Sequence, residues 1–225
     1  HHEIIDIGAY EVHIPKISFA DTIKSDTAWI ADTVAIAGNV TVNDEVHLTI
    51  LPGTYVEFQD TFHLKINGTL YAEGKPGNMI RFTRNVNDTA GFYNMWLADG
   101  GWKGIVFDNS DDGMNNEMIN NDTSVIKYCH FSFAKFPKSH SFGGAIQIRY
   151  FSNVKISHCV FENNKSSYGA GAITMEVTDI MISDCKFYKN YGDEGGAIFG
   201  NLSDIVLKNN IFDENNAFNF GGAVR

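Results

Sequence analysis

A short glycine-rich motif returns four times in the second half of the chain at nearly equal intervals. Its copies begin 27, 25 and 26 residues apart: Gly143-Gly144-Ala145-Ile146, Ala170-Gly171-Ala172-Ile173, Gly195-Gly196-Ala197-Ile198 and Gly221-Gly222-Ala223-Val224. A Phe followed three residues later by Asn keeps the same interval, and so does the series Cys129, Cys159, Cys185 and Asn210. A period of about 25 residues with strand-forming residues in each unit predicts a solenoid, in which each repeat stacks on the one before it.

Within each repeat, apolar and polar residues alternate on both sides of a two-residue break such as Ser157-His158 or Ser183-Asp184. This pattern predicts a strand, a sharp bend and a second strand. The glycine-rich motif then opens a third apolar stretch, and its paired glycines suit a positive φ or a close backbone approach. Three short strands per repeat predict an all-β fold, a right-handed parallel β-helix that is a single-stranded solenoid with about 25–26 residues per coil.

Equivalent side chains of stacked coils lie directly above one another, so the alignment of the repeats also predicts the core. We expect one buried column made of Phe131, Phe161, Phe187 and Phe212. We also expect a column of buried, reduced cysteines, and a column of asparagines whose side chains form hydrogen bonds from coil to coil. A leucine-rich repeat is the main alternative at this period, but no repeat has its Leu-x-x-Leu-x-Leu spacing.

The domain organisation follows from where the pattern starts and stops. We expect residues 1–29 to form an N-terminal linker and capping segment, with a tag remnant at His1-His2. Residues 30–225 are expected to form the β-helix, in seven or eight coils and truncated at the C-terminal end, because a solenoid stopped within a coil exposes apolar surface and an open strand edge.

Composition excludes several classes of function. The formal net charge of -10 argues against a nucleic-acid partner, which requires a basic face. No apolar run reaches the length of about 18 residues that a membrane-spanning helix needs. Three cysteines do not make a complete set of disulfides, and neither they nor the histidines have the spacing of a metal site. We therefore expect no metal and no cofactor.

Catalytic signatures are equally sparse. Polygalacturonase-like enzymes carry an Asn-Thr-Asp, an Asp-Asp pair, a Gly-His-Gly and an Arg-Ile-Lys, of which this chain has only Asp111-Asp112, in a polar insertion typical of a solvated loop. Pectate-lyase motifs are absent, and Arg149-Tyr150 is the one basic and aromatic pair at the end of a predicted strand. No catalytic residue is assigned.

Residues 84–101, 108–123 and 134–142 break the regular repeat, and solenoids often place such insertions on their binding face. The first insertion carries three aromatic residues, Phe92, Tyr93 and Trp96, whose flat faces suit stacking on sugar rings. We take these three as the candidate ligand-binding residues. The alternative is that the insertion folds its aromatic side chains inward and braces the coils.

The Gly-Gly-Ala-Ile and Phe-x-x-Asn repeats resemble those of polymorphic outer-membrane protein passengers and related bacterial adhesins. Residues 40–82 and Trp102-Lys103-Gly104-Ile105 look like the opening coils of secreted bacterial β-helix proteins, and residues 6–11 resemble the end of β-helix domains in very large bacterial surface proteins. The resemblance implies a secreted or cell-surface bacterial module that acts in adhesion, glycan binding or as a stalk. Its partner would be an extracellular polysaccharide or a host or neighbouring cell surface. The alternative is a polysaccharide lyase or a glycoside hydrolase.

Overall fold

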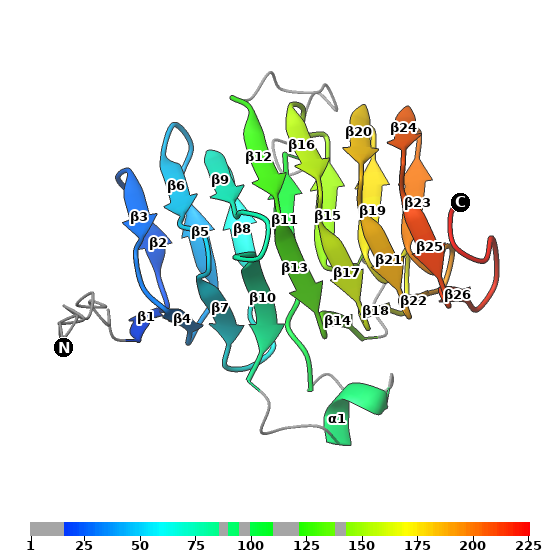
Figure 1. Cartoon of the computed structure of the whole chain (residues 1–225), viewed down its shortest axis with the longest axis horizontal. Coiled ribbons are helices and arrows are strands. Elements are labelled where there is room, and N and C mark those ends of the chain that lie inside the picture. Colours follow the sequence, from blue (N-terminus) through cyan, green and yellow to red (C-terminus); the bar gives the residue numbers. More distant parts are fainter. Residues whose placement is uncertain (1–15, 86–89, 95–99, 110–121, 138–142) are drawn as a thin grey trace, which may run out of the picture.

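The computed structural model describes residues 16–85, 90–94, 100–109, 122–137 and 143–225. Its strands are stacked along the longest axis of the molecule, and every pairing between named strands is parallel (Figure 1). The chain visits three sheets in turn and then returns to the first, one step further along the stack. The predicted fold class, an all-β parallel β-helix, is confirmed.

The bounds of the strands show this order. Sheet 1 contains β1, β4, β7, β10, β13, β17, β21 and β25: Ile17–Phe19, Thr33–Ile36, Tyr55–Phe58, Ile80–Arg84, Cys129–Ser132, Val160–Glu162, Lys186–Tyr188 and Ile211–Asp213. Sheet 2 contains β2, β5, β8, β11, β15, β19 and β23: Thr22–Ile23, Val40–Val42, Leu64–Ile66, Ile105–Asp108, Ile146–Arg149, Ile173–Glu176 and Ile198–Asn201. Sheet 3 contains β3, β6, β9, β12, β16, β20 and β24: Thr27–Trp29, His47–Ile50, Thr69–Glu73, Ser124–Lys127, Val154–Ser157, Ile180–Ser183 and Ile205–Lys208. The short sheet 4, between sheets 1 and 2, contains β14, β18, β22 and β26: Lys135–Phe136, Lys165–Ser166, Tyr191–Gly192 and Asn216–Ala217.

Strand pairing begins before the predicted boundary at residue 30. Strands β1, β2 and β3 pair with β4, β5 and β6, so the first coil of the stack starts at Ile17. The strands of this coil are only two or three residues long, and Ile17 pairs with Val34, a shorter interval than in later coils. Residues 1–15 lie outside the described residues.

The predicted column of phenylalanines fills the interior behind sheet 1. Phe82, Phe131, Phe161, Phe187 and Phe212 stack with nearly parallel rings, and the distances between successive ring centroids are 4.8, 4.8, 4.9 and 4.9 Å. This distance matches the spacing between neighbouring strands, because in-register strands place equivalent side chains directly above one another. The column therefore ties five coils together.

The bends between sheets 3 and 1 are made by residues in the left-handed region. His158 and Asp184 have φ values of 54° and 55°, which confirms the sharp bend predicted at both positions. In the glycine-rich motif, glycine is required mainly because the backbones of neighbouring segments approach it closely. A Cβ on Gly171 would lie 2.5 Å from the carbonyl oxygen of Asn164 and 2.6 Å from that of Tyr191, so a larger residue does not fit without backbone movement.

A ladder of asparagines lines the corner between sheets 1 and 4. The Oδ1 atom of Asn190 accepts hydrogen bonds from the backbone N–H and the Nδ2 of Asn164, at 3.1 and 3.0 Å. Asn215 accepts the same pair from Asn190, at 3.1 and 2.9 Å. The Nδ2 of Asn190 also donates to the carbonyl of Phe161, at 2.9 Å. The predicted passage of hydrogen bonds from coil to coil is confirmed.

The three cysteines are buried and free, and they stack at the bend between sheets 3 and 1, as predicted. The backbone N–H of Cys159 donates to the Sγ of Cys185 at 3.4 Å, and the Asn210 side chain takes the next place by accepting from the Cys185 N–H at 2.9 Å. Burial raises the pKa of the Cys159 thiol well above its ordinary value.

We therefore expect all three thiols to react slowly with a thiol reagent in the native protein. Only the thiolate is a good nucleophile, and both burial and the raised pKa of Cys159 suppress it. The measurement is the labelling rate at pH 8 with and without denaturant. Fast labelling of all three cysteines under native conditions would contradict their position inside the coil.

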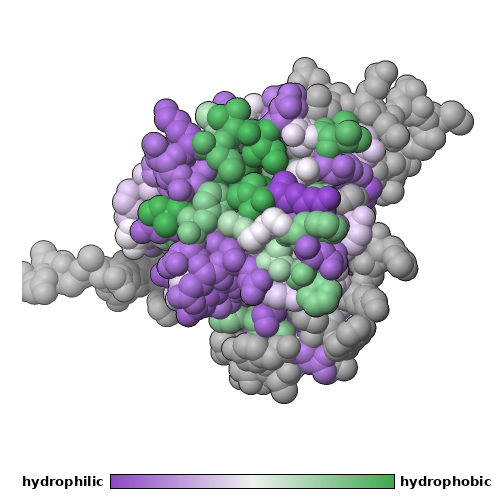
Figure 2. All heavy atoms as spheres, turned by 90° about the vertical axis from the view of Figure 1, so that its right-hand side faces the viewer, coloured by the Kyte–Doolittle hydropathy of each residue, from purple (hydrophilic) through white to green (hydrophobic). Residues whose placement is uncertain are grey.

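Apolar side chains are exposed at the end of the stack formed by the last coil. Leu207 is 38% exposed, whereas its in-register neighbour Ile182 in the preceding coil is fully buried. Phe218 and Phe220 are also exposed there, and Figure 2, which views this end, shows hydrophobic residues gathered on it. Within the described residues, this end therefore leaves an open edge on its sheets and part of the core in contact with solvent.

Candidate functional site

The first candidate region is the insertion that carries the predicted aromatic residues. Its short helix α1, Ala90–Tyr93, lies beside the coils below sheet 1 (Figure 1). Phe92 is only 1% exposed and packs edge-on against Phe133, with 5.3 Å between the ring centroids. The side chain of Tyr93 and all of Trp96 lie outside the described residues. In this arrangement Phe92 does not offer a flat face to a sugar, and its burial favours the bracing alternative for this residue.

Cationic side chains of the coils hold this segment in place. Lys135 is 1% exposed, and its ammonium donates hydrogen bonds to the backbone carbonyls of Gly91 and Asn94 near the end of α1. The Arg84 guanidinium donates to the carbonyl of Gly100 and lies 4.7 Å from the centre of the Phe92 ring. Carbonyl groups at the end of a helix carry partial negative charge and lack partners within it, so buried cations satisfy them.

Replacing Phe92 with alanine should therefore loosen this insertion. The truncation of a buried phenylalanine costs about 3–5 kcal/mol where the surroundings cannot collapse, and here the cation–π contact with Arg84 is lost as well. We expect faster proteolytic cleavage between residues 85 and 100 and a lower melting temperature. Phe218→Ala is the control, because that ring is 74% exposed. Unchanged cleavage and melting for Phe92→Ala would contradict the bracing role.

The second candidate region is the outer face of sheet 1. Alternation along the strands directs Phe82 and Phe131 inward, so the preceding residues, Arg81 and His130, face outward and are neighbours in register. Tyr55 is the in-register neighbour of Arg81 on the other side. Glu162 on β17 is in register with Ser132, two residues beyond His130, and reaches His130 diagonally, so the four side chains form a row that shifts sideways at its last strand. We call it the Tyr55–Glu162 row.

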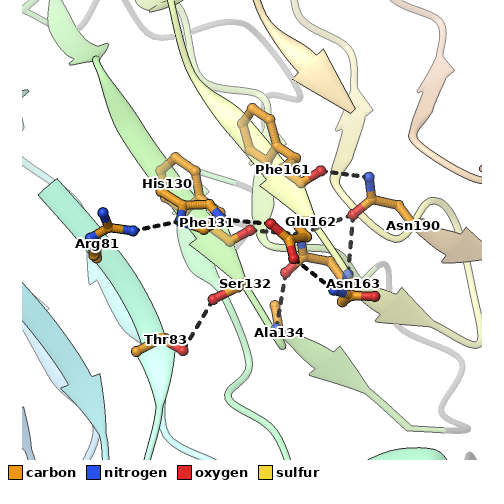
Figure 3. Close-up of polar contacts among 11 residues, drawn as sticks. Arg81, Thr83, His130, Phe131, Ser132, Ala134, Phe161, Glu162, Asn163 and Asn190 are labelled. Atoms are coloured by element: carbon orange, nitrogen blue, oxygen red, sulfur yellow. Dashed lines mark hydrogen bonds and ion pairs between the residues drawn. The ribbon is translucent and has the colours of Figure 1, made fainter. Parts of the chain in front are cut away.

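Hydrogen bonds fix the protonation state within this row. Arg81 Nη1 lies 3.1 Å from His130 Nδ1, and His130 Nε2 lies 3.2 Å from Glu162 Oε2 (Figure 3). A guanidinium only donates, so Nδ1 must accept and the ring is neutral, with its proton on Nε2 donated to Glu162. Burial lowers the pKa of His130, and the charge of Arg81 lowers it further against the opposing effect of Glu162. The imidazole thus links a cation to an anion without carrying charge itself.

Glu57 and Glu162, which lie in the outward column adjacent to Arg81, hold hydrogen bonds with other groups. Glu162 accepts at its second oxygen from Asn163 Nδ2, at 3.0 Å. Glu57 accepts from Lys16 Nζ at 2.8 Å and from Gln59 Nε2 at 3.0 Å. Across the described part of the chain, Arg81 makes no ion pair, and its guanidinium carbon lies 5.5 Å from the centre of the Tyr55 ring. Tyr55 is 47% exposed, so an aromatic ring and a cation lie side by side on the surface.

Arg149 provides a contrast on sheet 2. Its Nε donates to Glu176 at 2.8 Å, and its Nη1 donates to Asp108 at 3.2 Å. Burial acts to lower the pKa of Arg149, but these two carboxylates outweigh it and the pKa is raised. This arginine joins three adjacent strands, β11, β15 and β19, and its charge is neutralised within the fold.

The described residues contain no group of three or more His, Cys, Asp or Glu side chains placed to hold a metal ion. Within that same part of the chain, no helix is long and apolar enough to cross a membrane. Asp111-Asp112, the pair that matches one polygalacturonase signature, lies outside the described residues.

Comparison with known proteins identifies the family but not an activity. The model of the right handed beta helix region matches residues 85–224, more than half of the chain. A metabotropic glutamate receptor-like protein R of Dictyostelium discoideum is 32% identical over 78 residues, which is 33% of this chain and 5% of that protein. The chain thus spans a small fraction of the length of this relative. No solved structure gives a significant match.

Proposed function

Because this chain belongs to the right-handed β-helix family, we propose that it is a non-catalytic, carbohydrate-binding module of a secreted or cell-surface protein. The resemblance of its repeats to polymorphic outer-membrane protein passengers and adhesins supports the same setting. In this proposal the coils act as a rigid support, and the outer face of sheet 1 is the surface that contacts an extracellular glycan.

The observation that carries the proposal is the exposed ring of Tyr55 within a row of hydrogen-bonding groups. An aromatic face supplies apolar contact area at low entropic cost and suits stacking on a sugar ring. Arg81, His130 and Glu162 supply polar groups beside it, and the parallel strands hold them at fixed spacing. An extended chain of sugars lying across the strands would meet Tyr55, Arg81 and His130 on three successive coils, with Glu162 beside its path on the fourth.

A glycan array with purified protein tests this proposal. We expect binding by the native chain and at least a tenfold weaker signal for Tyr55→Ala. Tyr71→Ala is the matched control, because Tyr71 lies on β9 of sheet 3 and contacts His47 instead. Binding that depends on Tyr71 but not on Tyr55 would place the ligand on another face, and a blank array would reject the proposal.

A second assay separates binding from catalysis. The alternative function, a polysaccharide lyase or a glycoside hydrolase, predicts new absorbance from unsaturated ends or new reducing ends when the protein is incubated with polysaccharides. A binding module leaves the polymer intact. Product formed at a rate proportional to protein concentration would overturn the non-catalytic proposal.

A further inference from the structure

We infer that Arg81 is an anion-binding position and that the glycan bound on sheet 1 carries a carboxylate or a sulfate ester. This inference rests on the proposed function and specifies its ligand: an acidic glycan whose sugar ring lies against Tyr55 and whose charged group pairs with the guanidinium.

The first support is the way in which Arg81 is held. One of its Nη atoms is fixed on His130 Nδ1 (Figure 3). Its guanidinium carbon lies 5.5 Å from the centre of the Tyr55 ring. Two contacts of different kinds restrict the side chain on the surface. Arginine has five N–H groups in a planar fork, and contact through one Nη leaves others available for a planar or tetrahedral anion. A guanidinium that is already oriented loses less entropy on binding.

The second support is the local charge. The chain has a formal net charge of -10, yet this cation makes no ion pair with the described carboxylates. Glu57 and Glu162, the acids of the adjacent outward column, accept hydrogen bonds from other groups. Arg149 shows the structural use of the same residue type, with a carboxylate on each side. Arg81 therefore retains an unneutralised positive charge beside an exposed aromatic ring.

The third support is the neutral imidazole. Because His130 Nδ1 accepts from Arg81, the ring is neutral and adds no second positive charge to compete for the anion. Its Nε2 donates to Glu162, so the imidazole connects the guanidinium to that carboxylate. Thr83 and Ser132 lie in the adjacent outward column, joined by a hydrogen bond of 3.1 Å between their hydroxyl groups. Ser132 is only 8% exposed, so this pair supports the sheet beside the row and is not assigned to the ligand.

The test compares matched glycans on one immobilised protein. Biolayer interferometry would use hexuronate oligosaccharides, their methyl esters, sulfated hexose oligosaccharides and the unsulfated parents. We expect the hexuronate or the sulfated form to bind at least tenfold more tightly than its uncharged counterpart, and the class that does so identifies the anion. Arg81→Gln should abolish this preference. Arg149→Gln removes the same charge from sheet 2 and should keep it.

The outcomes separate the two proposals. If neutral and charged glycans bind equally, and Tyr55→Ala weakens both while Arg81→Gln weakens neither, then sheet 1 binds glycans but Arg81 is not an anion site. If no glycan binds, both proposals fail. Raising the salt concentration from 50 to 500 mM should weaken binding of the charged glycans alone, because exposed charge pairs are screened. An anion preference that survives in Arg81→Gln would place the anion elsewhere.

Discussion

Replacing Phe161 with alanine is expected to lower the melting temperature by about 10 °C. Its ring is fully buried between Phe131 and Phe187, with ring centroids 4.8 and 4.9 Å away. Truncation removes both stacking contacts and leaves a cavity in a column whose rings are fixed by strand spacing, so the neighbours cannot close the gap. The cost of such a change is about 3–5 kcal/mol.

Phe212→Ala is the matched control for this prediction. Phe212 belongs to the same column but is only partly buried, and its stacking partner is Phe187, 4.9 Å away. We expect about half the loss in stability, measured by thermal melting followed by circular dichroism at a fixed scan rate. Equal shifts in melting temperature for the two variants would mean that a second stacking contact and full burial add nothing to the stability that Phe161 provides.

The repeats of the second half of the chain predicted most of its structure. Phe161, Phe187 and Phe212 keep nearly constant spacing, and residues at equal spacing in a solenoid must stack. The cysteine and asparagine columns followed from the same alignment. The first coil was not predicted, because its strands are two or three residues long and it carries neither the glycine-rich motif nor the Phe-x-x-Asn pair. Short strands give too few alternations to mark a face.

The candidate site was much harder to predict from the sequence. Arg81 and His130 are 49 residues apart, and the insertions between them hide the register that makes them neighbours. The available signal was their shared place before a core phenylalanine, Phe82 or Phe131, but using it required the pairing of β10 with β13. The burial of Phe92 could not be predicted either, because the sequence of a glycine-rich insertion does not show whether its aromatic side chain packs inward or faces solvent.

Replacing Asn190 with leucine is expected to destabilise the protein by about 3 kcal/mol or more, although leucine is close in volume and more apolar. Asn190 is buried, accepts two hydrogen bonds from Asn164 and donates one to the carbonyl of Phe161. The variant removes the partner of the Asn164 backbone N–H and one of the two partners of Asn164 Nδ2, which keeps its bond to the Phe131 carbonyl. Each unsatisfied buried group costs about 1–3 kcal/mol. Relaxation of the corner recovers part of that sum.

Urea denaturation measures this loss, and Asn219→Leu controls for the chemical change. Asn219 also donates a side-chain hydrogen bond, to Asp193 at 2.7 Å, but at an exposed position where water replaces the lost partner. Its substitution is expected to change the free energy of unfolding by about 0.5 kcal/mol or less. If Asn190→Leu were equally harmless, the ladder would add nothing to stability. The recurrence of asparagine three residues after Phe161, Phe187 and Phe212 would then reflect the geometry of the turn, since a left-handed residue such as Lys189 precedes this position.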